Sequence, residues 1–261
     1  MDRGGWSTVP GAPGGALNSN GNGELRERAA ITSLIVASYA MGYFTIGWAT
    51  DPRRAHSLAT PLDALIPFVP ETIFLYTWLF TAMLFPLFVV RSPALFRRVG
   101  LAYAAVIAAC LVVFVVYPVS AADLRTGVGD VDVSRFTGWG VHLVYALDPP
   151  YNLFPSLHLA IATLAALSAW KARPIYGAIG FAWVLPIAVS VSTLKQHYVV
   201  DSVAGAALAC AVYAAIIRPY ARVSERESAY GWGGPLLYLG FNVLFYVAAY
   251  AAFRAGADVP G

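Results

Sequence analysis

The chain has 261 residues, of which 59% are hydrophobic and 12% are charged, and its mean hydropathy is +0.64. These fractions lie outside the range of ordinary soluble domains and are typical of an integral membrane protein. The formal net charge is only +3 and the basic residues are dispersed, which argues against a nucleic-acid-binding protein.

The N-terminal 28 residues are expected to form a disordered cytoplasmic tail. Residues 1–23 are rich in Gly, Pro, Ser and Asn and contain few large apolar side chains. Such a segment cannot bury enough apolar surface to offset the entropy of ordering. Because the first apolar segment begins only after this polar stretch, a cleaved secretory signal is not expected.

Seven apolar segments follow, each close to the roughly 20 residues that a helix needs to cross the hydrocarbon layer. The sequence therefore predicts an all-α polytopic membrane helix bundle. Residues 29–217 are expected to form a six-helix catalytic transmembrane domain. Residues 218–261 are expected to provide a cytoplasmic connector, a seventh transmembrane helix and the C-terminus. The predicted spans are 29–49, 71–90, 99–119, 154–170, 175–193, 199–217 and 235–253.

The distribution of basic residues predicts the orientation of the bundle. Eleven of the 17 Lys and Arg residues fall on the side of the N-terminus, so the positive-inside rule makes the N-terminus cytoplasmic. The opposite, extracytoplasmic side then carries the loops 50–70 and 120–153 and the turn that contains Lys195. The eleven are Arg3, Arg26, Arg28, Arg91, Arg97, Arg98, Lys171, Arg173, Arg218, Arg222 and Arg226.

Two loops on that side are candidates for binding elements. The loop 120–153 is the longest connection, and loops of this length are often lids. Within it, residues 134–147 can form a helix with Phe136, Trp139, Leu143 and Leu147 on one face, suited to lying along the membrane surface. The segment 61–70 contains three prolines that forbid a continuous helix, and we expect it to return toward the site.

Two short polar motifs lie at the ends of apolar segments on this predicted outer side. One includes Ser156 and His158, and the other includes His197 and Asp201. A histidine is unfavourable at the edge of hydrocarbon, so two of them at corresponding helix ends suggest a shared function. His197 and Asp201 are four residues apart, so on a helix they share a face and the carboxylate can hold one ring nitrogen. The other nitrogen is then free to attack a substrate.

The run 154–158 (FPSLH), followed by the run 195–201 (KQHYVVD), resembles the type 2 phosphatidic acid phosphatase superfamily. Within it the chain is most similar to the branch related to inositol phosphorylceramide synthase, whose members also tend to carry a proline-rich segment like 61–70. The resemblance covers roughly residues 60–217.

The resemblance implies roles for residues of both motifs. His197 would be the nucleophile that forms a phosphohistidine, Asp201 would orient it, and His158 would protonate the leaving group. Ser156 would help to hold phosphoryl oxygens. Lys195, Asn152 and Tyr198 are further candidates for substrate binding, and no metal or cofactor is expected.

The chain departs from the phosphatase pattern at two cationic positions. The first motif, Lys and Arg-Pro separated by six residues, does not occur, and the Ser-Arg of the third motif is replaced by Ser190 and Val191. A phosphomonoester carries nearly two charges and a diester one, so fewer cations suit a diester. Lys195 could replace one cation, and Arg125 or Arg135 could move in from the long loop.

These observations favour a membrane lipid phosphotransferase that moves a phospho-headgroup, such as phosphoinositol, from a phospholipid donor to a lipid or polyol acceptor. One alternative is a lipid phosphate phosphatase, in which water accepts the phosphoryl group. Another is a non-catalytic lipid-binding or transport protein whose histidines hold an anionic headgroup. A metal site built from His158, His197 and Asp201 is a further reading, although zinc ligands are usually closer together in sequence. The oligomeric state is left open.

Overall fold

The computed structural model describes residues 16–126, 128, 131–221 and 231–257, and in these ranges it contains helices and no β-strand. Five helical segments are long and apolar enough to cross a membrane, which confirms the predicted polytopic helix bundle. They are residues Asn22–Ala49 of α1 (Ala16–Ala49), α6 (Pro93–Val116), α10 (Pro174–Thr193), α11 (Val199–Val212) with the π-helical turn Tyr213–Ile217, and α12 (Gly233–Arg254).

The second predicted span is not one helix but three short ones. They are α3 (Ile73–Tyr76), α4 (Trp78–Ala82) and α5 (Phe85–Val89). The hydroxyls of Thr77 and Thr81 donate to the carbonyls of Ile73 and Trp78, at 3.0 Å in both cases. Such bonds compete with the regular helix pattern, and Pro86 at the start of α5 lacks an amide proton. An apolar composition therefore predicted the span correctly but not its breaks.

The N-terminal helix begins at Ala16, so the prediction of disorder up to residue 28 is wrong for residues 16–28. The polar turns of α1 are held against the start of α6. A guanidinium nitrogen of Arg97 donates to Glu27 at 2.8 Å, and Arg28 donates to the carbonyl of Val90 at 2.6 Å. These contacts across the bundle stabilise turns that the composition alone would leave unordered. Residues 1–15, and residues 222–230 of the predicted connector, lie outside the described residues.

The fourth predicted span, α9 (Leu157–Ala172), is the buried centre of the bundle. It packs against α10 and α11, and glycines on both neighbours permit close contact. A Cβ atom at Gly205 of α11 would lie 2.2 Å from the Ser156 carbonyl oxygen, and one at Gly177 of α10 would lie 2.4 Å from Trp170. Small residues at such contacts let helix backbones approach closely. The first turns of α9 and α11 are therefore brought side by side.

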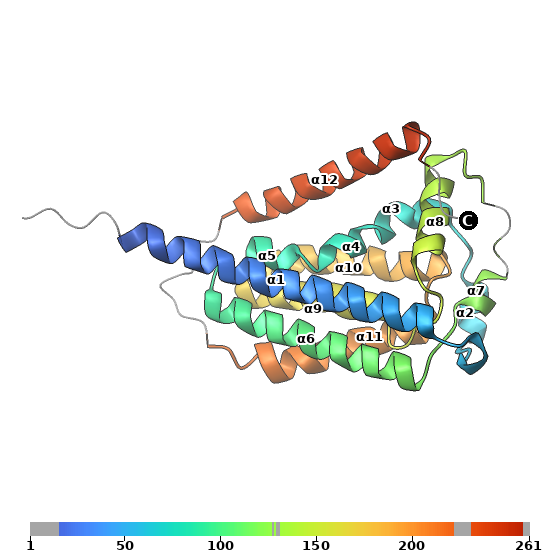
Figure 1. Cartoon of the computed structure of the whole chain (residues 1–261), viewed down its shortest axis with the longest axis horizontal. Helices are drawn as coiled ribbons and strands as arrows, with labels where there is room; N and C mark the ends of the chain where they lie inside the picture. The colour runs from blue at the N-terminus through green and yellow to red at the C-terminus, as the bar shows by residue number, and fades with distance from the viewer. Residues whose placement is uncertain (1–15, 127, 129–130, 222–230, 258–261) are drawn as a thin grey trace, which may run out of the picture.

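The predicted loop elements gather at one end of the bundle (Figure 1). This end carries the turn Pro52–Arg54, α2 (Pro61–Leu65), the turn Pro70–Thr72, α7 (Ala122–Arg125) and α8 (Phe136–Leu147). The helix predicted over 134–147 is thus confirmed as α8, which lies across the direction of the spanning helices.

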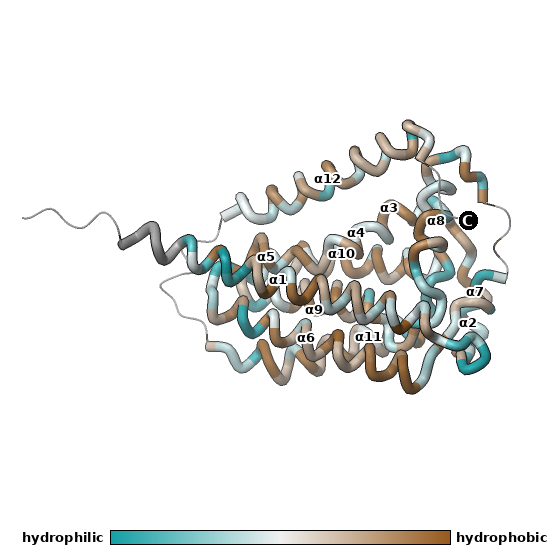
Figure 2. The backbone as a smooth tube through the Cα atoms, viewed as in Figure 1, coloured by the Kyte–Doolittle hydropathy of each residue, from teal (hydrophilic) through white to brown (hydrophobic). Residues whose placement is uncertain are grey.

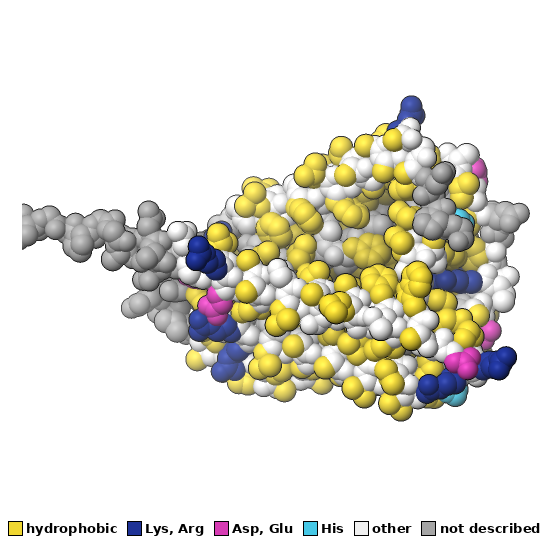
Figure 3. All heavy atoms as spheres, in the orientation of Figure 1, with side chains coloured by type: hydrophobic (Ala, Val, Ile, Leu, Met, Phe, Trp, Pro, Cys, Tyr) yellow, Lys and Arg dark blue, Asp and Glu magenta, His cyan; other side chains and the backbone are white. Residues whose placement is uncertain are grey.

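The sides of the bundle are apolar and its ends are polar. The backbone is hydrophobic along the spans and hydrophilic toward the ends, as Figure 2 shows. In the space-filling view, apolar side chains cover the flank, whereas Lys and Arg lie at the two ends (Figure 3). Large exposed apolar residues such as Leu101, Val112 and Leu244 belong to this flank. An uninterrupted apolar flank of this kind is the surface that lipid chains solvate.

Candidate active site

The two motif histidines are in direct contact. His158 lies in the first turn of α9, and His197 lies in the turn that precedes α11. The His158 Nδ1 atom is 3.0 Å from the His197 Nε2 atom, and the side chains are 3% and 2% exposed. The bundle therefore brings two imidazoles from different segments to one buried point, with one nitrogen of each ring facing the other.

Asp201 lies behind His197, on the side of the ring away from His158. Its Oδ2 atom is 3.5 Å from His197 Nδ1 and accepts a hydrogen bond of 2.9 Å from the amide of Tyr198. The prediction that His197 and Asp201 share a helix needs correction, because α11 begins only at Val199. The pair forms because the carboxylate of Asp201, in the first turn of α11, accepts the amide of Tyr198 just before the helix. This bond brings the preceding residue, His197, next to the same carboxylate.

Ser156 links the two motifs through the backbone. Its amide donates to the carbonyl of Asp201 at 3.0 Å, and its hydroxyl accepts from the amide of Leu159 at 3.3 Å, which caps α9. The side chain is fully buried. Ser156 therefore holds the start of α9 against α11 and fixes where His158 points.

Lys195 is engaged by the protein backbone. Its ammonium donates to the carbonyl of Asp63 at 3.1 Å and to that of Ile66, and its backbone adopts a φ of +54°. The carboxylate of Asp63 accepts from the amide of Val199 at 2.9 Å and caps α11. The proline-rich segment thus does return to the site, where Lys195 and Asp63 attach it to the start of α11.

Asn152 and Tyr198 also have protein partners. The Asn152 side-chain amide donates to the carbonyl of Tyr43 at 2.6 Å, and the Tyr198 hydroxyl donates to the carbonyl of Ser120 at 3.1 Å. Both side chains are buried. These bonds attach α1 and the long loop to the site, so the two residues contribute to its framework.

Arg125 is the cation that approaches the histidine pair from the long loop. It donates to the side-chain oxygen of Gln196 at 2.6 Å and stacks 4.3 Å from the ring centre of Tyr145. Burial raises the pKa of Tyr145 to about 12, so its hydroxyl stays protonated and donates to the carbonyl of Leu194. Within the described ranges, Arg125 Nε and Gln196 Nε2 are buried donors without a hydrogen-bond partner. Each of these atoms can donate a further hydrogen bond. Arg135, by contrast, is exposed at the start of α8.

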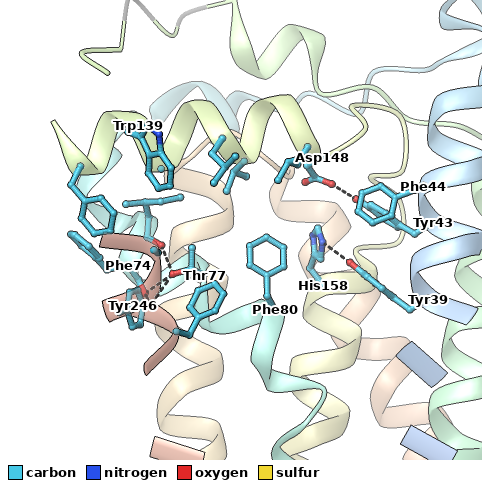
Figure 4. A pocket seen from close by; sticks show the side chains of 18 residues that line it. Tyr39, Tyr43, Phe44, Phe74, Thr77, Phe80, Trp139, Asp148, His158 and Tyr246 are labelled. Carbon is cyan, nitrogen blue, oxygen red and sulfur yellow. Dashed lines mark hydrogen bonds between the residues drawn. The ribbon is translucent and has the colours of Figure 1, made fainter. Parts of the chain in front are cut away.

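A carboxylate and three tyrosines surround the other side of His158. The Tyr39 hydroxyl is 3.3 Å from His158 Nε2. Tyr43 and Tyr76 donate to the two carboxylate oxygens of Asp148, at 2.6 and 3.2 Å. Figure 4 shows Asp148 and His158 close together at one side of an apolar cavity. Sequence reasoning missed these groups because the tyrosines lie in apolar segments without a motif, and only the fold brings them together.

The described residues do not offer a cluster of metal ligands. No three side chains of His, Cys, Asp or Glu in these ranges are grouped so that they could hold a metal ion. His158, His197 and Asp201 instead form a linear series, in which His197 lies between the other two.

Comparison with known proteins yields one match. The model of the PAP2 superfamily matches residues 64–215, which is more than half of the chain. No curated protein matches, and neither does any solved structure. The matched range includes both histidines and Asp201, whereas α1 and α12 lie outside it.

Proposed function

The chain belongs to the PAP2 superfamily, and on that premise we propose that it is a lipid phosphotransferase similar to inositol phosphorylceramide synthase. It would move a phospho-headgroup from a phospholipid donor to an acceptor hydroxyl through a phosphohistidine. The observation that carries the proposal is the contact of 3.0 Å between His158 and His197, with the Asp201 carboxylate on the far side of His197.

The first half-reaction uses the two nitrogens that face each other. The lone pair of His197 Nε2 attacks the phosphorus, and the bond from phosphorus to the lipid oxygen breaks. His158, protonated at the start, gives its proton to that leaving oxygen. The charge on the His197 ring is stabilised by Asp201, whose Oδ2 lies 3.5 Å from Nδ1. The products are a lipid alcohol and a phosphodiester-like headgroup bound to His197.

The second half-reaction reverses these steps with a new alcohol. The acceptor hydroxyl attacks the phosphorus, the phosphorus–nitrogen bond breaks, and His158 takes the proton of the hydroxyl. Because the two ring nitrogens are in hydrogen-bonding contact, a phosphorus atom does not fit between them, and substrate binding must separate the rings. If water enters instead of the alcohol, the same steps complete a hydrolysis.

The charge available near His197 favours a diester donor. The ammonium of Lys195 bonds to backbone carbonyls, whereas the guanidinium of Arg125 bonds to Gln196, the residue before the proposed nucleophile. The single positive charge of Arg125 matches the single negative charge of a diester better than the double charge of a monoester. Arg125 Nε and Gln196 Nε2, two buried donors without a partner, can also bond to its oxygens. This supports transfer over phosphatase activity, and with it the inositol phosphorylceramide synthase-like branch.

Replacing His197 tests the proposed nucleophile. His197→Ala should lower turnover by roughly a thousandfold or more, because it removes the nitrogen on which the covalent intermediate forms. In the native protein, incubation with donor should give an acid-labile adduct on His197, detected by mass spectrometry. The control is His142→Ala, which changes an exposed histidine of α8 and should leave turnover unchanged. Near-normal activity of His197→Ala would rule the mechanism out.

Product analysis separates the candidate reactions. With a diacyl phosphoinositide donor and a lipid alcohol acceptor, transfer yields diacylglycerol and a new phospholipid. Release of inorganic phosphate from a lipid phosphomonoester, without transfer, would indicate a phosphatase. Donor binding with neither product would indicate a non-catalytic lipid-binding protein.

A further inference from the structure

A cavity of about 350 Å³ lies between α1, the broken second span, α8 and α12. Its volume lies in the usual range for sites of small molecules. Its walls are mainly aromatic and aliphatic, with Phe44 from α1, Phe80 from α4, Leu143 from α8 and Phe245 from α12. We name this cavity the apolar chamber. Such a lining favours a ligand with a long apolar body.

The carboxylate and the histidine of the chamber wall lie at one place, away from the hydroxyls of Thr77 and Tyr246. His158 and Asp148 belong to its wall, whereas His197 does not. The carboxylate of Asp148 holds the hydroxyls of Tyr43 and Tyr76 and retains lone pairs that can accept a further hydrogen bond (Figure 4). The chamber therefore meets the histidine pair on the side of His158, the proposed proton donor. A ligand with a hydroxyl at one end and hydrocarbon beyond it matches this distribution.

Helix α12 forms one wall of the chamber, and the chamber also reaches the apolar flank of the bundle, because its lining residues Phe44 and Phe80 are 40% and 44% exposed. Phe245, Tyr246 and Ala249 of α12 line the chamber, while Leu244 and Val247 are exposed. The helix is attached by polar contacts in the same region, where Thr81 donates to Asn242 at 2.6 Å and the hydroxyls of Thr77 and Tyr246 are 2.7 Å apart. Because α12 qualifies as a membrane span, the medium outside it is hydrocarbon.

We infer that the apolar chamber binds the hydrocarbon chain of the lipid alcohol, with the hydroxyl at His158 and Asp148. The inference rests on the proposed function, because His158 protonates the alcohol that leaves and deprotonates the alcohol that attacks. Both alcohols must then occupy the same place. The headgroup lies on the other side of the pair, near Arg125 and Gln196. Two walls of the chamber, α1 and α12, lie outside the residues matched by the family model.

Photolabelling of the full chain carrying His197→Ala tests the chamber without relying on turnover. The probe is a long-chain primary alcohol with a diazirine near the end of the chain, applied to the purified protein in lipid nanodiscs. Mass spectrometry should place the label on α8 and on the chamber face of α12, and an excess of the unmodified alcohol should prevent it. Label confined to the exposed residues of α12 would overturn the inference.

Adjacent alanines on α12 supply a matched pair of variants. Ala249 lines the chamber and Ala248 is exposed. Ala249→Trp should reduce labelling at least about tenfold, since the indole occupies space that the chain needs, whereas Ala248→Trp should leave labelling unchanged. Leu143→Trp fills the chamber from α8 and should act like Ala249→Trp, so a folding defect of one variant does not decide the outcome. Equal labelling in all variants would refute the chamber.

The result separates the two proposals. Chamber labelling of the His197→Ala variant, together with no phosphohistidine in the native protein incubated with donor, would retain the binding site and reject the reaction. Phosphohistidine formation without chamber labelling would retain the reaction and reject the site.

Discussion

At the scale of single residues, a lysine and an arginine near His197 have roles that sequence position does not reveal. Lys195 is two residues from His197, yet its ammonium bonds to the carbonyls of Asp63 and Ile66. Arg125 is distant in sequence but bonds to Gln196, the neighbour of His197. Lys195 has a left-handed backbone conformation in the turn that precedes α11. In such a turn, the side chains of residues that are close in sequence can point in different directions.

Neutral substitutions distinguish these two roles. Lys195→Met leaves two carbonyls without their donor, so we expect a loss of stability of about 1–3 kcal/mol and a lower melting temperature. Arg125→Met also leaves a buried oxygen, that of Gln196, without its donor and should lower the melting temperature as well, but of the two variants only Arg125→Met should raise the KM for an anionic donor. Thermal unfolding and donor titrations measure both effects. A raised KM with unchanged stability in Lys195→Met would identify Lys195 as a phosphate ligand.

At the scale of elements, the contact between α9 and α11 positions the site. Gly205 of α11 lies against the carbonyl of Ser156, and the amide of Ser156 bonds to the carbonyl of Asp201. A side chain at Gly205 would separate the two helix starts. The breaks in the second span act at the same scale, because they let α3 and α4 curve around the apolar chamber.

Gly205→Ala tests this contact. The added Cβ would lie 2.2 Å from a backbone oxygen, so we expect destabilisation of about 1–3 kcal/mol and a marked loss of turnover as the histidines move apart. Gly240→Ala is the control, because nothing lies within 4 Å of its Cβ position on α12. Melting curves and activity assays of both variants provide the comparison. Equal behaviour of the two would show that close approach at Gly205 is not required.

At the scale of the whole molecule, α7 and α8 lie at one end of the bundle and the N-terminal turns of α1 lie at the other (Figure 1). The histidine pair belongs to the end of α7, because Arg125 of α7 bonds to Gln196, whereas Glu27 belongs to the N-terminal turns of α1. Polar contacts of Arg98 with the carbonyl of Ile216, and of Lys171 with that of Arg218, belong to the end of Glu27. The excess of basic residues on that side predicts that it is cytoplasmic and that the site faces outward.

Cysteine accessibility in intact cells measures this orientation. His142→Cys places a thiol on exposed α8, and Arg26→Cys places one on the exposed opposite end of α1. A membrane-impermeant maleimide should label His142→Cys before lysis and Arg26→Cys only after lysis. The native thiols, Cys110 in the core and Cys210 in the membrane-spanning part of α11, should be replaced by Ser first. The reverse labelling pattern would invert the predicted topology.

The sequence alone determined the class of the molecule and the identity of its motifs. Apolar runs long enough to span predicted the helix bundle, because lipid forces the backbone to satisfy its own hydrogen bonds. The periodicity of residues 134–147 predicted α8, since amphipathic spacing is a local property. The two histidine motifs indicated the superfamily, which the match over residues 64–215 bears out.

Only the tertiary structure decided how distant side chains meet. The hydrogen bonds of Tyr43 and Tyr76 to Asp148, and the bond of Arg125 to Gln196, join segments that no local pattern relates. The contacts of Glu27 and Arg28 with the start of α6 likewise join segments that are distant in sequence. One wall of the apolar chamber comes from α12, which lies far along the chain from the other walls. Each of these features arises from packing between elements, which local composition and periodicity do not encode.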